Sequence, residues 1–296
     1  MGCSEWCKQE FKPCNFGFGK HLRPELTVTS QWPSLPPVIY LAWRWFAFAY
    51  HLAWLIVTVA AATIYTAGRA TWFAYLTNWT YFLLTVDVLI EALASLVWYF
   101  RARNPNVDVV PETTTWYMKL SWFMYSITTT VVVLVGLTYW YDNHHCLCFF
   151  LAAGADDFYI DVQTHGITLV YVVLNLALTG VPVRIYHLIY PFAFAVLYTV
   201  FTVIYYYAGG VSKNGKRYVY KGVLDWADPN TSLTWISILA FVGIPVIHVL
   251  LVYGLHLVRV TIHNKCFGDD CMADNKVRQA EMTTLSDENT KSYCIA

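Results

Sequence analysis

Charged residues are scarce in this chain. Only 13% of its 296 residues are Asp, Glu, Lys or Arg, and 57% are hydrophobic, whereas an ordinary soluble domain carries about 25% charged residues. The formal net charge is zero, and no basic block suggests a nucleic-acid partner. These deficits argue against a soluble domain and a nucleic-acid-binding protein. They indicate an integral membrane protein whose main partner is the lipid bilayer.

Two further signals are missing. The first 30 residues are polar and lack the apolar core of a secretory signal peptide, so we expect the first membrane helix to act as its own signal.

The eight cysteines form no Cys-x-x-Cys pair, which disfavours a metal site, and no cofactor is expected. Lipidation by palmitoylation is expected at Cys3, and also at Cys266, because both cysteines fall in tails assigned to the cytosol.

Long apolar runs are abundant. Crossing a bilayer takes about 20 residues of helix, and six segments qualify, at 38–66, 72–99, 117–141, 162–183, 187–208 and 235–260. The sequence therefore predicts an all-α fold, a polytopic membrane bundle of six transmembrane helices forming one domain at residues 37–263. Residues 1–36 are predicted to be an N-terminal cytosolic tail with a flexible, polar beginning, and residues 264–296 a disordered cytosolic tail.

Lys and Arg distribute unevenly between the two ends of this bundle. With the N-terminus in the cytosol, the inner side receives fourteen of them and the outer side five. Because basic residues favour the cytosolic side, we expect both termini inside, in a multi-pass protein of the plasma membrane. The inner set includes Arg44, whereas the cluster at 213–221 runs against the rule. The sequon at Asn230 falls outside, where glycosylation occurs.

Two membrane segments carry polar residues along one helical face. The second segment has Thr77, Thr80, Asp87 and Glu91, and the fourth repeats their spacing with His165, Thr168, Asn175 and Thr179. Both segments run from outside to inside in the expected topology. The first residue of each set should therefore lie near the outer surface, and Asp87 and Asn175 about 15 Å deeper.

Three interpretations of these polar faces remain open. Asp87 and Glu91 are expected to face the bundle interior, since ionisable groups in a bilayer are costly and usually pair. The polar residues could hold the helices together by hydrogen bonds. Alternatively, His165 could accept the hydroxyl proton of Thr77, and the alkoxide could attack an ester carbonyl. A transporter could also use Asp87 and Glu91 as a proton or cation relay.

Other histidines are less informative. His51, His248 and His256 fall within the first and sixth segments, and they form no two pairs at matched depths, which disfavours a haem. The run His144-His145-Cys146, with Cys148, could bind a metal weakly, but a solvated outer loop is the favoured interpretation.

Five short motifs, in this order and spacing, resemble the rolling stone family of multi-pass membrane proteins. They are YLTNW at 75–79, THGITLVYVVLN at 164–175, PVRIYHLIYP at 182–191, YYAGG at 206–210 and YKGVLDWADP at 220–229. The resemblance covers the chain from about Ser30 to His263. It implies a membrane protein associated with muscle cell fusion, so we expect a role in cell–cell fusion or membrane remodelling.

The same scaffold is more distantly similar to the androgen-induced family of membrane hydrolases, which cleave esters of fatty acids with hydroxy fatty acids. Thr77 in YLTNW and His165 in QTHG match that family's threonine and histidine. The chain departs from the pattern at Asn78-Trp79, where the hydrolases have apolar residues and then an aspartate, and at Asn175, which replaces an acid. This resemblance implies an alternative function, a threonine/histidine hydrolase with a lipid ester as substrate.

Overall fold

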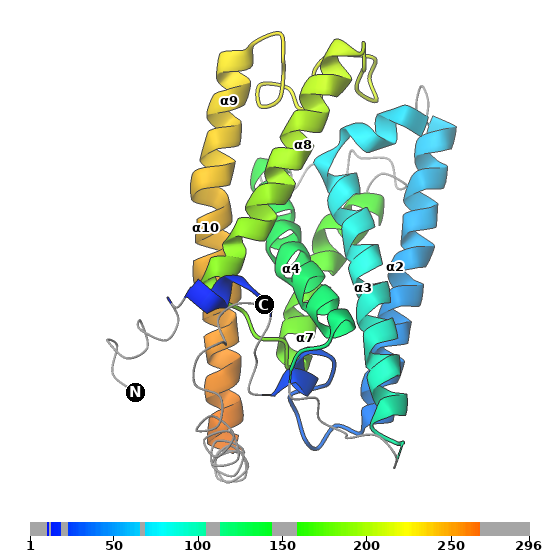
Figure 1. The fold of residues 1–296 in the computed structure, drawn as a ribbon. Coiled ribbons are helices and arrows are strands. Elements are labelled where there is room, and N and C mark those ends of the chain that lie inside the picture. The colour runs from blue at the N-terminus through cyan, green and yellow to red at the C-terminus, as the bar shows by residue number, and fades with distance from the viewer. Residues whose placement is uncertain are drawn as a thin grey trace.

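The computed structural model describes residues 11, 13–18, 23–65, 69–104, 113–143 and 159–266 of the chain. These residues fold into a bundle of long helices (Figure 1), and no strand is found among them. Six helices are long and apolar enough to cross a membrane. The all-α, six-span prediction is therefore confirmed.

The helices follow one another up and down the bundle. In chain order they are α2 (Pro37–Tyr65), α3 (Leu76–Arg101), α4 (Trp116–Asn143), α7 (Thr168–Leu178), α8 (Ile189–Tyr207), α9 (Pro229–Ile238) and α10 (Ile244–Val246). A π-helical turn at Val162–Ile167 leads into α7. The helix that contains α9 and α10 runs without a break from Pro229 to Cys266.

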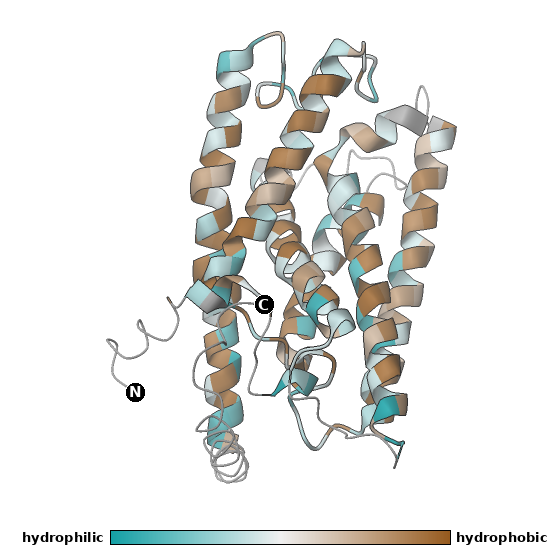
Figure 2. Cartoon of the chain, viewed as in Figure 1, coloured by the Kyte–Doolittle hydropathy of each residue, from teal (hydrophilic) through white to brown (hydrophobic). Residues whose placement is uncertain are grey.

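α4 lies at the centre of the bundle. In the most apolar 18-residue stretch of α4, 72% of the residues are buried inside the protein, against 17% in the corresponding stretches of the spans that contain α2 and α8. The outer helices instead present large apolar side chains such as Phe46, Ile204 and Phe241. Figure 2 shows apolar residues along the middle of these helices and polar residues at their ends. This surface matches a lipid solvent, in which apolar side chains outside the protein core carry no penalty.

Three spans have bounds that differ from the sequence-based prediction by four residues or more; the second begins at Leu76 rather than residue 72, after a short 3-10 turn at Arg69–Ala74. The fourth span covers Tyr159–Leu178 rather than 162–183. At Thr179 the backbone turns extended, with φ −78° and ψ 151°, because the following Gly180 and Pro182 disfavour a continued helix. The sixth span is longer than predicted, since Asp228 caps its first turn by accepting from Thr231 N–H and Pro229 occupies the first helical position.

The sixth helix is irregular around its proline. A proline lacks the N–H that would continue the backbone ladder. Pro245 is flanked by π-helical turns at Leu239–Gly243 and Ile247–Tyr253. Such turns absorb the missing hydrogen bond without ending the helix.

The expectation of a flexible N-terminal tail is wrong for residues 23–32. The side chains of Ser30 and Gln31 donate to the carbonyls of Leu178 and Ala177, at 2.9 and 2.8 Å. Arg259 donates to the Thr179 carbonyl at 2.7 Å. The last carbonyls of a helix have no partners within it, and these groups supply them. Residues 23–32 are therefore an ordered part of the bundle, packed against the end of α7. Cys3, His144-His145-Cys146, Cys148 and residues 267–296 lie outside the described residues.

Candidate functional site

A buried ion pair joins α2 and α3, on the side of the bundle where α2 begins and α3 ends. Arg44 of α2 donates from Nη1 to Glu91 Oε2 of α3 at 2.7 Å. The same nitrogen lies 2.6 Å from Asn175 Oδ1 of α7. Tyr171 donates its hydroxyl to Glu91 at 3.3 Å, and Tyr40 accepts from Arg44 Nη2. We call Tyr40, Arg44, Glu91, Tyr171 and Asn175 the Arg44 cluster.

The structure corrects the placement of Arg44. The charge count assigned it to the inner surface, but its side chain is 1% exposed and lies two helical turns into α2. The signal that could have identified it is its position inside the first apolar run, since an intramembrane charge needs a partner of opposite sign. Glu91 and Asn175, which sequence spacing predicted to face inward, are its partners.

Asp87 lies one helical turn from Glu91 and outside that ion pair. It is 1% exposed. The Thr128 hydroxyl of α4 donates to Asp87 Oδ2, while Oδ1 has no hydrogen-bond partner among the described residues. Sequence reasoning predicted that Asp87 faces inward and did not identify Thr128, whose polar neighbours on α4 gave no periodic signal.

A second polar group, also missed from the sequence, lies between the first, second and fourth spans. His51 Nδ1 is 3.2 Å from the Tyr81 hydroxyl. Gln163 donates to that hydroxyl at 3.3 Å and accepts from Tyr50 at 2.6 Å. Among the described residues, no three His, Cys, Asp or Glu side chains gather to hold a metal ion.

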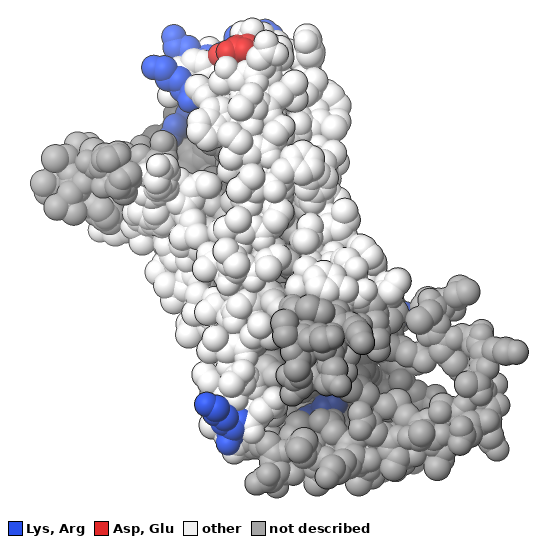
Figure 3. Space-filling model, turned by 90° about the vertical axis from the view of Figure 1, so that its left-hand side faces the viewer, with Lys and Arg blue, Asp and Glu red and all other residues white. Residues whose placement is uncertain are grey.

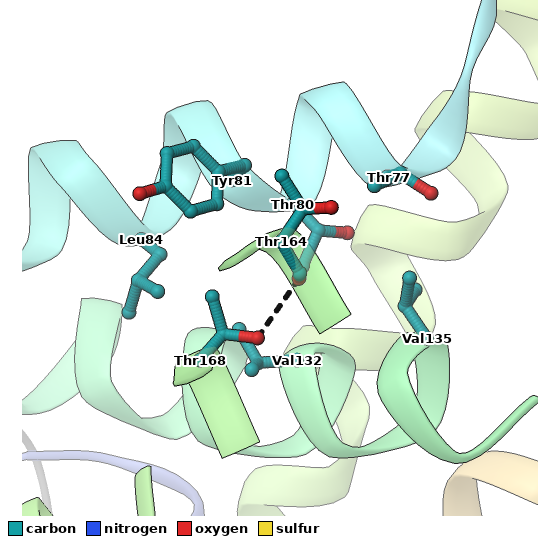
Figure 4. A pocket seen from close by; sticks show the side chains of 8 residues that line it. All are labelled: Thr77, Thr80, Tyr81, Leu84, Val132, Val135, Thr164 and Thr168. Carbon is teal, nitrogen blue, oxygen red and sulfur yellow. Dashed lines mark hydrogen bonds between the residues drawn. The ribbon is translucent and has the colours of Figure 1, made fainter. Parts of the chain in front are cut away.

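A small pocket lined by hydroxyls lies toward the other end of α3 (Figure 4). Its walls are Thr77, Thr80, Tyr81, Leu84, Val132, Val135, Thr164 and Thr168. Thr168 donates to the Thr164 carbonyl at 2.8 Å. The Thr80 hydroxyl is buried and has no partner among the described residues. The pocket is narrow, and no space for a water-sized sphere remains between its walls.

Thr77 is half-buried in the first turn of α3, next to Tyr220 of the loop between α8 and α9. The Tyr220 hydroxyl accepts from the Leu76 N–H at 2.9 Å. Burial raises the pKa of Tyr220 to about 12, against the lowering effect of its hydrogen bonds with Leu76 and Thr77. The first hydroxyl of the predicted catalytic pair therefore lies beside a loop tyrosine.

His165 faces a different neighbour. Its ring stacks on Tyr139 of α4, with centroids 3.8 Å apart and parallel planes. Its Nδ1 is buried without a partner among the described residues, and the ring is not part of the pocket wall. The structure brings Thr77, Thr80 and Thr168 together around the pocket, and no hydrogen bond joins Thr77 to His165 in the described part of the chain. Their catalytic pairing stays a prediction.

Comparison with known proteins matches this chain along most of its length. A family model described as Protein rolling stone matches residues 2–271. Protein rolling stone of Drosophila melanogaster is 29% identical over 275 residues, covering 89% of this chain and 94% of that protein. No solved structure matches the chain.

Proposed function

Because the chain belongs to the rolling stone family, we propose that this multi-pass membrane protein acts at the plasma membrane in cell–cell fusion, or in the membrane remodelling that fusion requires. The observation that carries the proposal is the family match, which includes all six spans. The cellular role follows from the association of the rolling stone family with muscle cell fusion.

The packing of the bundle supports a role for the loops at its two ends in binding partners, because the buried polar groups inside it serve to hold the helices together. Glu91, Arg44 and Asn175 bond one another across three helices and are at most 4% exposed. Buried polar groups that satisfy one another hold membrane helices in one arrangement. The loops at the two ends of the bundle are then the surfaces that meet partners, and we assign the loop between α8 and α9 to the outer side.

Content mixing between cells tests this proposal. Fusion-competent cells in which the chain is depleted, carrying one half of a split fluorescent protein, are mixed with cells carrying the other half. We expect fluorescence to fall on depletion and to return with the wild-type chain. Unchanged mixing after depletion contradicts the proposal, provided that loss of the chain from the cell surface has been verified.

A second function that we propose is hydrolysis of a lipid ester, for which the hydroxyl-lined pocket would have to widen, since it has no room for a water-sized sphere. We propose Thr77 as nucleophile and His165 as general base, on the observation that His165 has a buried ring nitrogen without a partner among the described residues, in the turn next to Thr164 of the pocket wall. Hydroxyl and imidazole must approach to about 2.6–3.2 Å. Thr77 must therefore leave Tyr220, and His165 must leave its stack on Tyr139.

Labelling with a fluorophosphonate probe tests the hydrolase. Purified wild type is compared with Thr77→Ala, His165→Ala and the matched control Thr80→Ala, which removes a hydroxyl from the same pocket. We expect labelling in wild type and in the control, and none in the other two variants. A folded wild type that takes up no label, or equal labelling in all four proteins, rejects this second function.

A further inference from the structure

The loop between α8 and α9 exposes a cluster of cations. Lys213, Lys216, Arg217 and Lys221 are all exposed, and we call them the basic loop patch. Figure 3 shows Lys and Arg side chains gathered at the end of the molecule where α8 and α9 are joined. This is the cluster that ran against the charge distribution of the rest of the chain.

The patch is held in a defined shape. Positive φ angles at Gly209, Gly215 and Gly222 turn the chain sharply, which glycine does at little cost. Ser212 N–H donates to the Lys216 carbonyl at 2.7 Å. The Lys213 N–H donates to the Tyr75 hydroxyl at 3.0 Å, which ties the loop to the start of α3. The spacing of the cations is therefore set by the fold before any partner binds.

The cations of the patch form no ion pair with the acids of the described residues. In the described part of the chain the ion pairs are Arg23–Glu25 and Arg44–Glu91. Asp225 and Asp228, on the same loop, instead accept hydrogen bonds from Ala227 N–H and from Thr231. Arg217 lies over the Tyr206 ring at 4.5 Å, which fixes the guanidinium and leaves its charge intact.

We propose that the basic loop patch binds a sulfated polysaccharide of the cell surface. Short Lys- and Arg-rich stretches with fixed spacing suit a polyanion. Anionic phospholipids are concentrated in the cytoplasmic leaflet, so an outward patch meets sulfated glycans rather than acidic lipid. The inference rests on the proposed outward orientation of this loop and gives the protein a partner at cell contacts.

Retention on immobilised heparin tests the inference directly. The purified full-length protein in detergent is eluted with a salt gradient, beside Lys213→Ala/Lys216→Ala/Lys221→Ala, which keeps Arg217 and its contact with Tyr206. The matched control, Arg103→Ala/Lys119→Ala/Lys265→Ala, removes the same number of charges from the opposite end of the bundle. Since each surface cation contributes at best about a factor of five to binding of a polyanionic surface, we expect affinity to fall by roughly 10- to 100-fold in the loop variant and to stay within about twofold in the control.

Three further measurements keep the test decisive. The wild-type protein should not be retained on heparin that has been chemically desulfated. This comparison does not depend on the folding of any variant. Intact cells expressing the chain should bind labelled heparin, which requires the loop to face outward. Vesicles rich in phosphatidylserine should bind less than heparin. Equal retention of the loop and control variants, binding to the vesicles alone, or binding by purified protein but not by intact cells overturns the proposal. None of these readouts depends on fusion, so their failure is distinct from failure of the proposed function.

Discussion

At the scale of single residues, the ion pair between Arg44 and Glu91 has the largest energetic consequence. Both side chains are 1% exposed. Glu91→Gln leaves the guanidinium buried without its counter-ion, and breaking such a pair costs about 3–5 kcal/mol. We expect a clear fall in the thermal unfolding temperature of the detergent-solubilised protein. Lys265→Gln, at an exposed residue near the C-terminal end of the last helix, serves as control and should leave that temperature unchanged.

The double variant Arg44→Met/Glu91→Met separates charge from packing. It removes both charges and keeps side chains of similar length, so it should recover most of the stability lost in Glu91→Gln. If the double variant unfolds at the same temperature as Glu91→Gln, then the two residues stabilise the bundle by something other than their mutual pairing.

How far residues could be predicted from the sequence depends on their periodicity. Glu91 and Asn175 belong to two polar faces with the same spacing; Glu91 was expected to face inward because of its charge, and both side chains are buried and hydrogen-bonded to each other. Arg44 stands alone in its helix, and a charge near the start of a span looks like a surface residue until the depth of the helix is known. The stacking of His165 on Tyr139 depends on the rotation of α4 beside the fourth span, which composition does not encode.

At the scale of helices, Tyr220 links the loop after α8 to the start of α3. Its hydroxyl accepts from the Leu76 N–H at 2.9 Å, one of the donors that a helix cannot satisfy itself. Tyr220→Phe should cost about 1 kcal/mol of stability and speed hydrogen exchange in the first turn of α3. Tyr218→Phe, on the same loop, is the control. Equal exchange in both variants contradicts the capping role.

The same tyrosine predicts a dependence on pH. Burial raises the pKa of Tyr220 to about 12, from about 10 in the unfolded chain. The neutral hydroxyl is thus favoured by the fold, and its stabilising contribution is complete below pH 10 and lost as the pH rises toward 12. The difference in unfolding temperature between wild type and Tyr220→Phe should therefore shrink over this range. A difference that is constant between pH 9 and pH 12 contradicts the assignment.

α4 and α7 approach each other closely at Gly136. A Cβ at this position would lie 2.8 Å from Leu169 Cγ, closer than real contacts allow. Gly136→Ala should therefore destabilise the bundle by about 1–3 kcal/mol, measured by thermal unfolding. Gly254→Ala, where a Cβ meets nothing within 4 Å, should be neutral or slightly stabilising. Similar effects of the two substitutions would show that this contact is not tight.

Helices were easier to predict than their ends. Each apolar run gave one span, because a helix of about 20 apolar residues matches the thickness of the hydrocarbon core of a bilayer and satisfies its own backbone hydrogen bonds there. The fourth span ends at Leu178, where Gly180 and Pro182 disfavour further helix, and residues 23–32 and Arg259 bind its last carbonyls. Those contacts come from distant parts of the chain, so a local pattern could not reveal them.

At the scale of the whole molecule, the orientation of the bundle in the membrane decides which surface meets other cells. Asn230 is exposed in the first turn of α9, beside the basic loop patch. If this end faces outward, the sequon is a substrate for glycosylation. We expect peptide N-glycosidase to increase the gel mobility of the wild type and to have no effect on Asn230→Gln.

The sequon at Asn78 provides the control for this assay. Its side chain is half-buried and donates to the Trp72 carbonyl at 2.7 Å. Asn78→Gln should therefore leave the mobility shift unchanged. A shift that disappears in Asn78→Gln and persists in Asn230→Gln would mean that the glycan is attached at the start of α3 instead.

Content mixing between cells tests most directly whether the end of this rolling stone family member that carries the basic loop patch acts in fusion. Depleted cells are complemented with wild type, with Lys213→Ala/Lys216→Ala/Lys221→Ala, or with Arg103→Ala/Lys119→Ala/Lys265→Ala, at equal surface levels. The account predicts that mixing returns with wild type and the variant at the opposite end and stays low with the loop variant. Mixing that is independent of the chain, or that is restored equally by all three proteins, contradicts it.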